Sequence, residues 1–322
     1  MKILVTGATG FVGSPLIRLL SSQGHQVIGA VRSQSNVSVD TFAGVELKAV
    51  GDIHGSLDWM PCLAGVDVVV HLANRAHVLH ESDANPLALY RTINTEGTLQ
   101  LARQAAAAGV KRFIFISSVK VNGESTLPGQ RFSPASEHIP GDHYGLSKYE
   151  AEQGLKELSL KTGMEVVIIR PPLIYGPGVK ANFLKMMRWV EKGIPLPLGS
   201  ITNQRSLLGI DNLLDFIGVC LTHPKAAGQT FLISDDHDVS TTELLKEIAN
   251  AMHRSSRLLA VPQFVLEKCL ILLGQGHNAE RLCASLKLDI TLAKTQLSWK
   301  PPYSFKDQMS KTVAAYLSER SD

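Results

Sequence analysis

Two side chains four positions apart, Tyr144 and Lys148, would share one face of a helix and could act together in acid–base chemistry. A tyrosine hydroxyl has an ordinary pKa near ~10, and a neighbouring ammonium group stabilises the phenolate and lowers that pKa. Alone, the spacing is weak evidence of catalysis, because many helices carry such a pair on a solvent-facing surface. Support must come from other parts of the chain.

Ser117 and Ser118 follow the apolar run of residues 112–116, which we expect to be a strand. In a parallel sheet, the residues after a strand lie at the carboxyl edge, where substrates bind. Ser118 is therefore placed to hydrogen-bond the same substrate oxygen as Tyr144. Its alternative role is a helix or turn cap.

A glycine-rich turn, Gly7 to Gly13, follows a predicted strand and opens a predicted helix. Gly7 permits the tight turn, Gly10 lets the backbone approach a pyrophosphate, and Gly13 allows close packing of the helix. The alternative is a turn that binds no ligand. We expect a dinucleotide here, with further contacts from the intervening residues Thr9, Phe11 and Val12.

The type of nicotinamide depends on the end of the second predicted strand, where NAD-binding proteins place a carboxylate for the ribose 2′-hydroxyl. That strand ends without an acid and is followed by Arg32, whose guanidinium could pair with a 2′-phosphate. We therefore favour NADP(H), with NAD(H) possible; alternatively, Arg32 stacks on the adenine. Asp52 is expected to bind the adenine amino group, and Ile53 to contact the cofactor.

Short β-branched runs alternate with longer helical stretches in the first half of the chain, which predicts an α/β fold of the doubly wound Rossmann type. The expected strands are 2–6, 26–31, 45–50, 67–72, 112–117 and 165–170, and the two long helices are 87–108 and 144–161.

After Arg170 the alternation becomes irregular and prolines interrupt it, so a smaller mixed α/β lobe is expected to begin there. We divide the chain into a dinucleotide-binding domain, 1–172, and a mainly nucleotide-sugar-binding lobe, 173–322, with segments near 203–234 returning to the first domain. The expected helices of this part are 181–192, 211–221, 241–252, 263–273, 290–297 and 305–319, with strands near 206–208 and 230–233.

Composition excludes several classes of protein. The chain has 322 residues, of which 44% are hydrophobic and 19% charged, and a net charge of +3 without a long basic run, so no nucleic-acid partner is expected. Its four cysteines lack metal-site or disulfide spacing, which predicts reduced thiols and no metal. The longest late apolar segment is too short for a membrane span, and the start lacks a signal-peptide core. We expect a cytoplasmic protein.

Together these motifs resemble the extended short-chain dehydrogenase/reductase family of nucleotide-sugar epimerases, dehydratases and reductases. The resemblance runs nearly end to end and includes the Gly7–Gly13 turn, His71-Leu72-Ala73, Asn94, Ser117-Ser118, Tyr144 with Lys148, and Arg170-Pro171. It implies that Lys148 holds the nicotinamide ribose, that Asn94 supports the site from beneath, and that residues 73–81 line the sugar side. It also implies cofactor contacts at Leu72, Ala73, Ser117, Arg170 and Pro171, and a homodimer formed by helices 87–108 and 144–161.

The same resemblance places the substrate, a UDP-sugar, in the second lobe. Asn182 matches a position that contacts the diphosphate, Arg205 matches an arginine that clamps a phosphate, and Arg281 is a second possible clamp. Each could instead be a solvated surface residue. Residues 178–207 look most like bacterial C4-reductases that form UDP-N-acetylquinovosamine.

Three reactions remain to be separated. A 4,6-dehydratase carries an Asp-Glu pair after the catalytic hydroxyl, whereas Val119 and Lys120 follow Ser118, so dehydration is disfavoured. Because Arg32 favours an exchangeable NADP(H) and Lys120 departs from the small residue common in 4-epimerases, we prefer a C4-reductase of a UDP-4-keto-6-deoxy-N-acetylhexosamine. The alternatives are a 4-epimerase with retained NAD and an inactive dinucleotide-binding sensor. In the expected mechanism Tyr144 donates the proton, Ser118 polarises the carbonyl, and Lys148 lowers the pKa of Tyr144.

Overall fold

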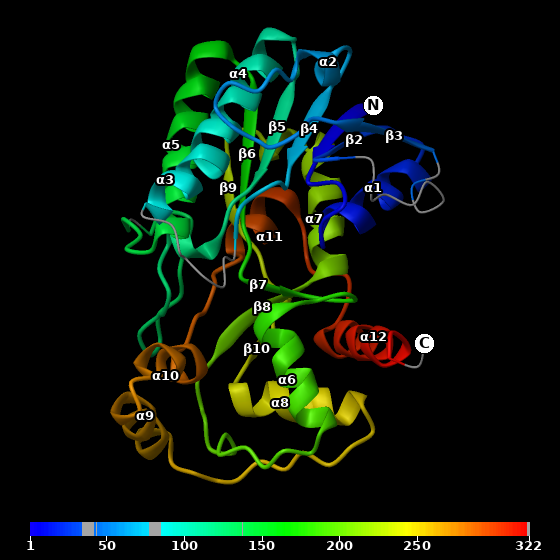
Figure 1. Cartoon of the computed structure of the whole chain (residues 1–322). Helices are drawn as coiled ribbons and strands as arrows, with labels where there is room; N and C mark the ends of the chain where they lie inside the picture. Colours follow the sequence, from blue (N-terminus) through cyan, green and yellow to red (C-terminus); the bar gives the residue numbers. More distant parts are fainter. Residues whose placement is uncertain (34–41, 43, 77–84, 137, 321–322) are drawn as a thin grey trace.

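A seven-stranded parallel sheet forms the larger part of the fold (Figure 1), in the order β3-β2-β1-β4-β5-β6-β9. The computed structural model of the chain describes residues 1–33, 42, 44–76, 85–136 and 138–320, and the backbone alone at 277, 278, 280 and 281. The strands are β1 (Lys2–Thr6), β2 (Gln26–Val31), β3 (Val45–Ala49), β4 (Val68–His71), β5 (Arg112–Ile116), β6 (Glu165–Arg170) and β9 (Thr230–Leu232). The strand order reverses between β1 and β4, which is where Rossmann-type sheets bind dinucleotides.

Helices cover both faces of this sheet, which explains why its inner strands are continuous apolar runs rather than alternating ones. One face packs against α2 (Met60–Leu63), α4 (Thr98–Ala107) and α5 (His143–Thr162). The other packs against α1 (Gly13–Ser22), α7 (Ile210–Thr222) and α11 (Thr291–Leu297), with the short η4 (Pro224–Ala226) nearby (Figure 1). The first six predicted strands are confirmed to within one residue at each end.

The second lobe is built on a three-stranded sheet in the order β10-β8-β7. Strands β7 (Leu173–Tyr175) and β8 (Arg205–Gly209) are parallel, and β10 (Asp238–Val239) is antiparallel to β8. A separate apolar core joins this sheet to α6 (Ala181–Glu191), α8 (Thr241–Ala251) and α12 (Phe305–Ser318). Helices α9 (Gln263–Leu272) and α10 (Gly276–Cys283) lie at the lobe's outer edge (Figure 1).

The long helix predicted over 87–108 is divided in the structure. It consists of α3 (Pro86–Tyr90), a π-helical stretch η2 (Arg91–Gly97) and α4. Gly97 allows this stretch to lie against the loop after β3, because a Cβ there would be 2.4 Å from the Ile53 side chain. The short elements α2, α10, β7 and β10 were not predicted. Among the described residues, no helix has the length and hydropathy needed to cross a bilayer.

Candidate active site

Helix α5 and the end of β5 bring the predicted catalytic residues together. The Asp142 side chain caps α5 by accepting a hydrogen bond from the Gly145 backbone N–H at 3.1 Å, which places Tyr144 in the first turn. Ser118, directly after β5, hydrogen-bonds the Tyr144 hydroxyl and also caps the short helix η3 (Val119–Val121). The catalytic and capping roles considered for Ser118 are therefore compatible.

Lys148 is fully buried one turn further along α5. Its Nζ donates to the backbone carbonyl of Ile116 at 2.7 Å and lies 4.2 Å from the centre of the Phe115 ring. Burial lowers the pKa of Lys148 to about 7, with Glu152 acting in the opposite direction. The amine is thus held beneath the end of β5.

The expected lowering of the Tyr144 pKa by Lys148 is wrong for this structure. Burial raises the pKa of Tyr144 to about 12, and the hydrogen bond with Ser118 only partly offsets that effect. The physical reason is that Lys148 points to Ile116 and is itself desolvated. In this arrangement the protonated phenol form of Tyr144 is favoured.

A buried ionic network supports the site from below, and the motifs did not reveal it. Glu152 accepts hydrogen bonds from Ser117 Oγ at 2.5 Å, Arg170 Nε at 2.9 Å and Arg170 Nη2 at 2.5 Å, and Arg170 Nη1 donates to Asn122 Oδ1 at 3.0 Å. The side chains of Ser117 and Arg170 therefore take part in this network, and the cofactor contacts expected of these two residues stay a prediction. The spacing Tyr144, Lys148, Glu152 on one helix face was the available signal.

The glycine turn has the geometry of a phosphate-binding turn. Gly7 has φ +65°, and a Cβ there would be 3.0 Å from the Ala73 backbone nitrogen. The Gly10 N–H donates to the Gly7 carbonyl at 2.9 Å, and a Cβ on Gly13 would be 2.1 Å from that oxygen. Gly13 therefore allows close packing of α1 on the turn itself rather than on the sheet. Thr9 and Gly10 are exposed, while Phe11 and Val12 are partly buried and pack against the core.

Thr6 ties this turn to the end of β4. Its Oγ1 accepts hydrogen bonds from the backbone N–H groups of Leu72 and Ala73 at 3.2 and 3.1 Å, and lies 2.7 Å from His71 Nδ1. Burial lowers the pKa of His71 to about 3, so the ring is neutral, and its Nε2 shares a hydrogen bond with Thr98 Oγ1 at 2.9 Å. Leu72 and Ala73 thus lie beside the turn, and their contact with a cofactor stays a prediction.

Arg32 and Asp52 meet at the far end of the predicted cofactor site. Arg32 Nε lies 2.9 Å from Asp52 Oδ1, and both side chains are largely exposed. From the sequence, we expected Arg32 to bind the 2′-phosphate and Asp52 to bind the adenine amino group. In the structure the two side chains pair with each other. The carboxylate compensates the charge that Arg32 would offer to a 2′-phosphate.

Residues 3–234 match the sequence profile of the NAD dependent epimerase/dehydratase family, which covers more than half of the chain. The chain belongs to this family. A UDP-glucose 4-epimerase of Vibrio cholerae is 49% identical over 317 residues, covering 98% of this chain and 95% of the relative. The family member is therefore an NAD-dependent nucleotide-sugar enzyme.

Solved structures give the same fold. A UDP-glucuronic acid 4-epimerase from Bacillus cereus in complex with NAD has a TM-score of 0.80 at 22% identity and covers 99% of each chain. A UDP-glucose 4-epimerase from Thermotoga maritima with UDP-glucose has a TM-score of 0.78 at 21% identity, covering 99% and 100% of the two chains. These likenesses establish the α/β Rossmann-type architecture of this family member.

Asn94 links the segment after β4 to helix α5. Its amide bonds the backbone of Arg75 in both directions, at 2.8 and 3.1 Å, and donates to Ser147 Oγ at 3.0 Å. It therefore joins the segment after β4 to α5. Residues 77–81 of the expected sugar-side segment lie outside the described residues.

The predicted substrate residues are spread along the second lobe. Asn182 is exposed in the first turn of α6, next to Ala181 with φ +54°. Arg205 on β8 donates to the Ala284 carbonyl at 3.0 Å, which brings β8 to the end of α10. Arg281 lies in α10, and its side chain is outside the described part of the structure. Pro171 follows β6, and its carbonyl accepts from the Val119 N–H at 3.0 Å.

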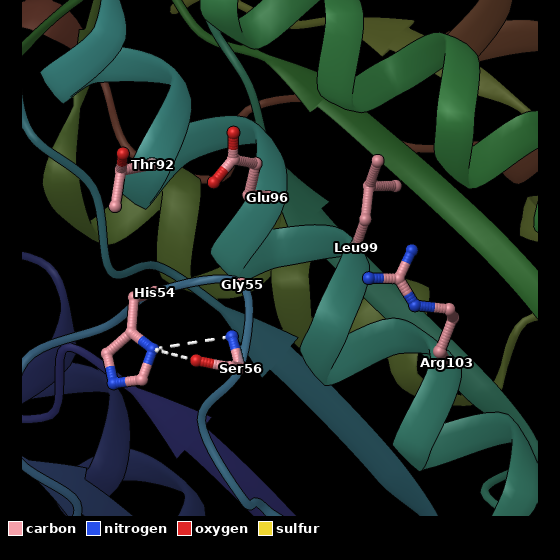
Figure 2. Close-up of a pocket in the computed structure, with 7 residues that line it drawn as sticks. All are labelled: His54, Gly55, Ser56, Thr92, Glu96, Leu99 and Arg103. Atoms are coloured by element: carbon pink, nitrogen blue, oxygen red, sulfur yellow. Dashed lines mark hydrogen bonds between the residues drawn. The ribbon is translucent and has the colours of Figure 1, made fainter.

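Two cavities lie near this framework. One, of about 460 Å³, is formed where the loop after β3 meets η2 and α4 (Figure 2); His54 Nδ1 is 3.0 Å from Ser56 Oγ there. Its described lining includes none of the predicted catalytic residues, so we assign it no chemical role. The other, of about 1000 Å³, is lined by residues between Asn122 and Asp142 and adjoins the start of α5.

Proposed function

We propose that this enzyme interconverts the C4 epimers of a UDP-hexose or UDP-N-acetylhexosamine and retains its NAD between turnovers. The observation that carries the proposal is the 49% identity to the Vibrio cholerae UDP-glucose 4-epimerase over 98% of the chain. The joining of Ser118, Tyr144 and Lys148 at the end of β5 supplies groups that this reaction needs. This replaces our preference for a C4-reductase.

The pairing of Arg32 with Asp52 supports NAD rather than NADP(H). A 2′-phosphate near Arg32 would also lie near the Asp52 carboxylate, and like charges at short range repel. The preference for NADP(H) rested on an uncompensated arginine. The turn at Gly7, Gly10 and Gly13 fits a dinucleotide, because Cβ atoms at these positions would meet neighbouring backbone at 2.1 to 3.0 Å.

The residues of the chain perform the proton chemistry. A bound NAD, held by the turn at Gly7, Gly10 and Gly13, would supply a reversible hydride acceptor for C4 of the sugar. Tyr144 moves the C4 hydroxyl proton, Ser118 hydrogen-bonds the same oxygen, and Lys148 is available to hold the cofactor ribose. Glu152 and Arg170 keep the floor of the site rigid through their bidentate pair.

The second lobe is proposed to bind the UDP group. Residues 1–172 would form the dinucleotide-binding domain and most of 173–322 the nucleotide-sugar lobe, with Asn182, Arg205 and Arg281 facing the diphosphate. The helical segment 87–108, which comprises α3, η2 and α4, and α5 are proposed to form a homodimer interface. All four cysteines are free, which suits the reducing cytoplasm as its location.

The C4-reductase is a second candidate because of Lys120. Its Nζ pairs with Glu124 at 2.7 Å and Asp142 at 3.1 Å, so a charged cluster occupies a place where many 4-epimerases have a small hydroxyl residue. A reductase acting on a 4-keto sugar would use the same Ser118 and Tyr144.

One experiment separates the two reactions. The purified enzyme is incubated with UDP-glucose or UDP-N-acetylglucosamine without added cofactor, and separately with a UDP-4-keto-6-deoxy-N-acetylhexosamine plus NADPH or NADH. Inversion at C4 without added cofactor is expected, and Tyr144→Phe should abolish it while leaving NAD binding measurable. Stoichiometric consumption of reduced cofactor without inversion would contradict the epimerase and support the reductase.

A further inference from the structure

Large apolar side chains are concentrated on the outer edge of the second lobe. Leu259, Phe264, Ile271, Leu272 and Leu273 are exposed by 55%, 64%, 62%, 86% and 71%, and Ile194 lies on the adjoining segment. We call these six residues the apolar rim. A patch of this kind at one edge marks an interaction surface more often than scattered exposed leucines do.

Helix α9 has apolar side chains on two faces, whereas a helix at a protein surface usually has one apolar face toward the core and one polar face toward solvent. Leu266 is buried in the lobe core and Leu270 packs against it, so one face is already covered. Phe264, Lys268 and Ile271 follow the i, i+4, i+7 spacing on the opposite, exposed face. That outer face combines apolar side chains with a lysine, as in helices that lie in a membrane interface.

The rim is bordered by basic groups. Residues 192–197 and 252–273 contain four basic side chains, Lys192, Arg254, Arg257 and Lys268, and one acidic side chain, Glu267. All four basic residues are exposed, whereas Glu267 accepts from Gln263 Nε2 at 2.8 Å. Backbone hydrogen bonds between Leu196 and Leu259 join the two segments into one edge.

We propose that the apolar rim docks on the surface of an anionic phospholipid bilayer, with α9 lying in the interface and its basic border facing the headgroups. The positive border favours this occupant over a second copy of the chain, because a two-fold contact would bring like charges together. Helix α9 ends at Leu272, and Leu273 and Gly274 follow it; the two exposed leucines at this end suit shallow insertion. The inference is independent of the reaction proposed above.

The full-length enzyme is tested by flotation with vesicles of phosphatidylcholine alone or mixed in equal parts with phosphatidylglycerol. Binding to the mixed vesicles is expected. Ile271→Ser/Leu272→Ser should weaken it by roughly tenfold for each side chain, since each loses most of its apolar burial. Arg257→Gln/Lys268→Gln should weaken it by about fivefold per charge and reduce its dependence on phosphatidylglycerol.

The matched control is Met60→Ser, which removes an apolar side chain that is 47% exposed on α2, in the larger domain and outside the rim. It should bind vesicles like the unaltered enzyme. Circular dichroism and enzymatic turnover without vesicles check that each variant is folded. Failure of the unaltered enzyme to float, or equal losses in the rim and Met60 variants, would overturn the proposal. So would a rim variant that changes the oligomeric state but not vesicle binding, which would assign the rim to a second copy.

Discussion

Glu152→Gln is expected to lower the free energy of unfolding strongly, because Glu152 is the centre of the buried network. The carboxylate is fully buried and accepts three hydrogen bonds, one from Ser117 and two from Arg170. The amide keeps the size of the side chain but removes its charge. The Arg170 guanidinium, 5% exposed, then keeps at most one of its two hydrogen bonds to position 152 and has no negative charge beside it; its other acceptors are Asn122 Oδ1 at 3.0 Å and the Pro134 carbonyl at 3.4 Å.

Removing one member of a buried ion pair costs about 3–5 kcal/mol, a large part of the ~5–15 kcal/mol that stabilises a typical protein. Unfolding in urea, followed by fluorescence and circular dichroism, measures this directly. For an m-value of about 3 kcal/mol/M, the midpoint should fall by roughly 1–1.7 M.

Glu157→Gln is the matched control, because it makes the same substitution on the same helix. Glu157 pairs with Lys161 at 3.8 Å, and both side chains are at least 70% exposed. Its expected cost is below about 1 kcal/mol. Glu152→Gln/Arg170→Met, which removes both charges, should recover part of the lost stability. If Glu152→Gln costs no more than Glu157→Gln, the network beneath the site does not hold the fold as argued.

Three further predictions concern the cofactor and the buried lysine. Gly13→Ala would place a Cβ 2.1 Å from the Gly7 carbonyl oxygen, so NAD affinity measured by titration calorimetry should fall by more than about tenfold. Gly218→Ala is the control, because a Cβ added at Gly218 has no neighbouring atom within 4 Å, and it should leave the affinity unchanged. Asp52→Asn frees the arginine paired with it, so the affinity for NADPH relative to NADH should rise by about tenfold, and an unchanged ratio would contradict the argument on cofactor choice. The pKa of Lys148 is lowered from 10.5 to about 7 in the folded protein. Between these two pH values the unfolded chain therefore binds more protons than the folded one. As a result, this lysine makes the free energy of unfolding rise with pH over that range. Lys148→Met should lose that contribution, and parallel stability curves of the two proteins across this window would contradict the assigned pKa.

Local sequence patterns were sufficient to predict most of the strands, helix ends and turns. The apolar runs of the strands, the glycine stop after α5 and the turn from Gly7 to Gly13 depend on neighbours in sequence, and the structure places them within a residue or so. The π-helical stretch around Asn94 was not visible in the same way, because it depends on a contact of Gly97 with the loop after β3. Regular helical periodicity hides such a local change.

The sequence by itself determined the fold class and the types of residue in the site, because glycine turns, helix spacing and strand ends are local properties. Tertiary structure alone decided what each charged group does. Arg32 became the partner of Asp52 and Arg170 the partner of Glu152, across separations in the chain that no spacing rule connects. Tertiary structure also decided that the pKa of Tyr144 is raised and that of Lys148 is lowered. Both changes come from burial, which depends on everything that packs around a side chain.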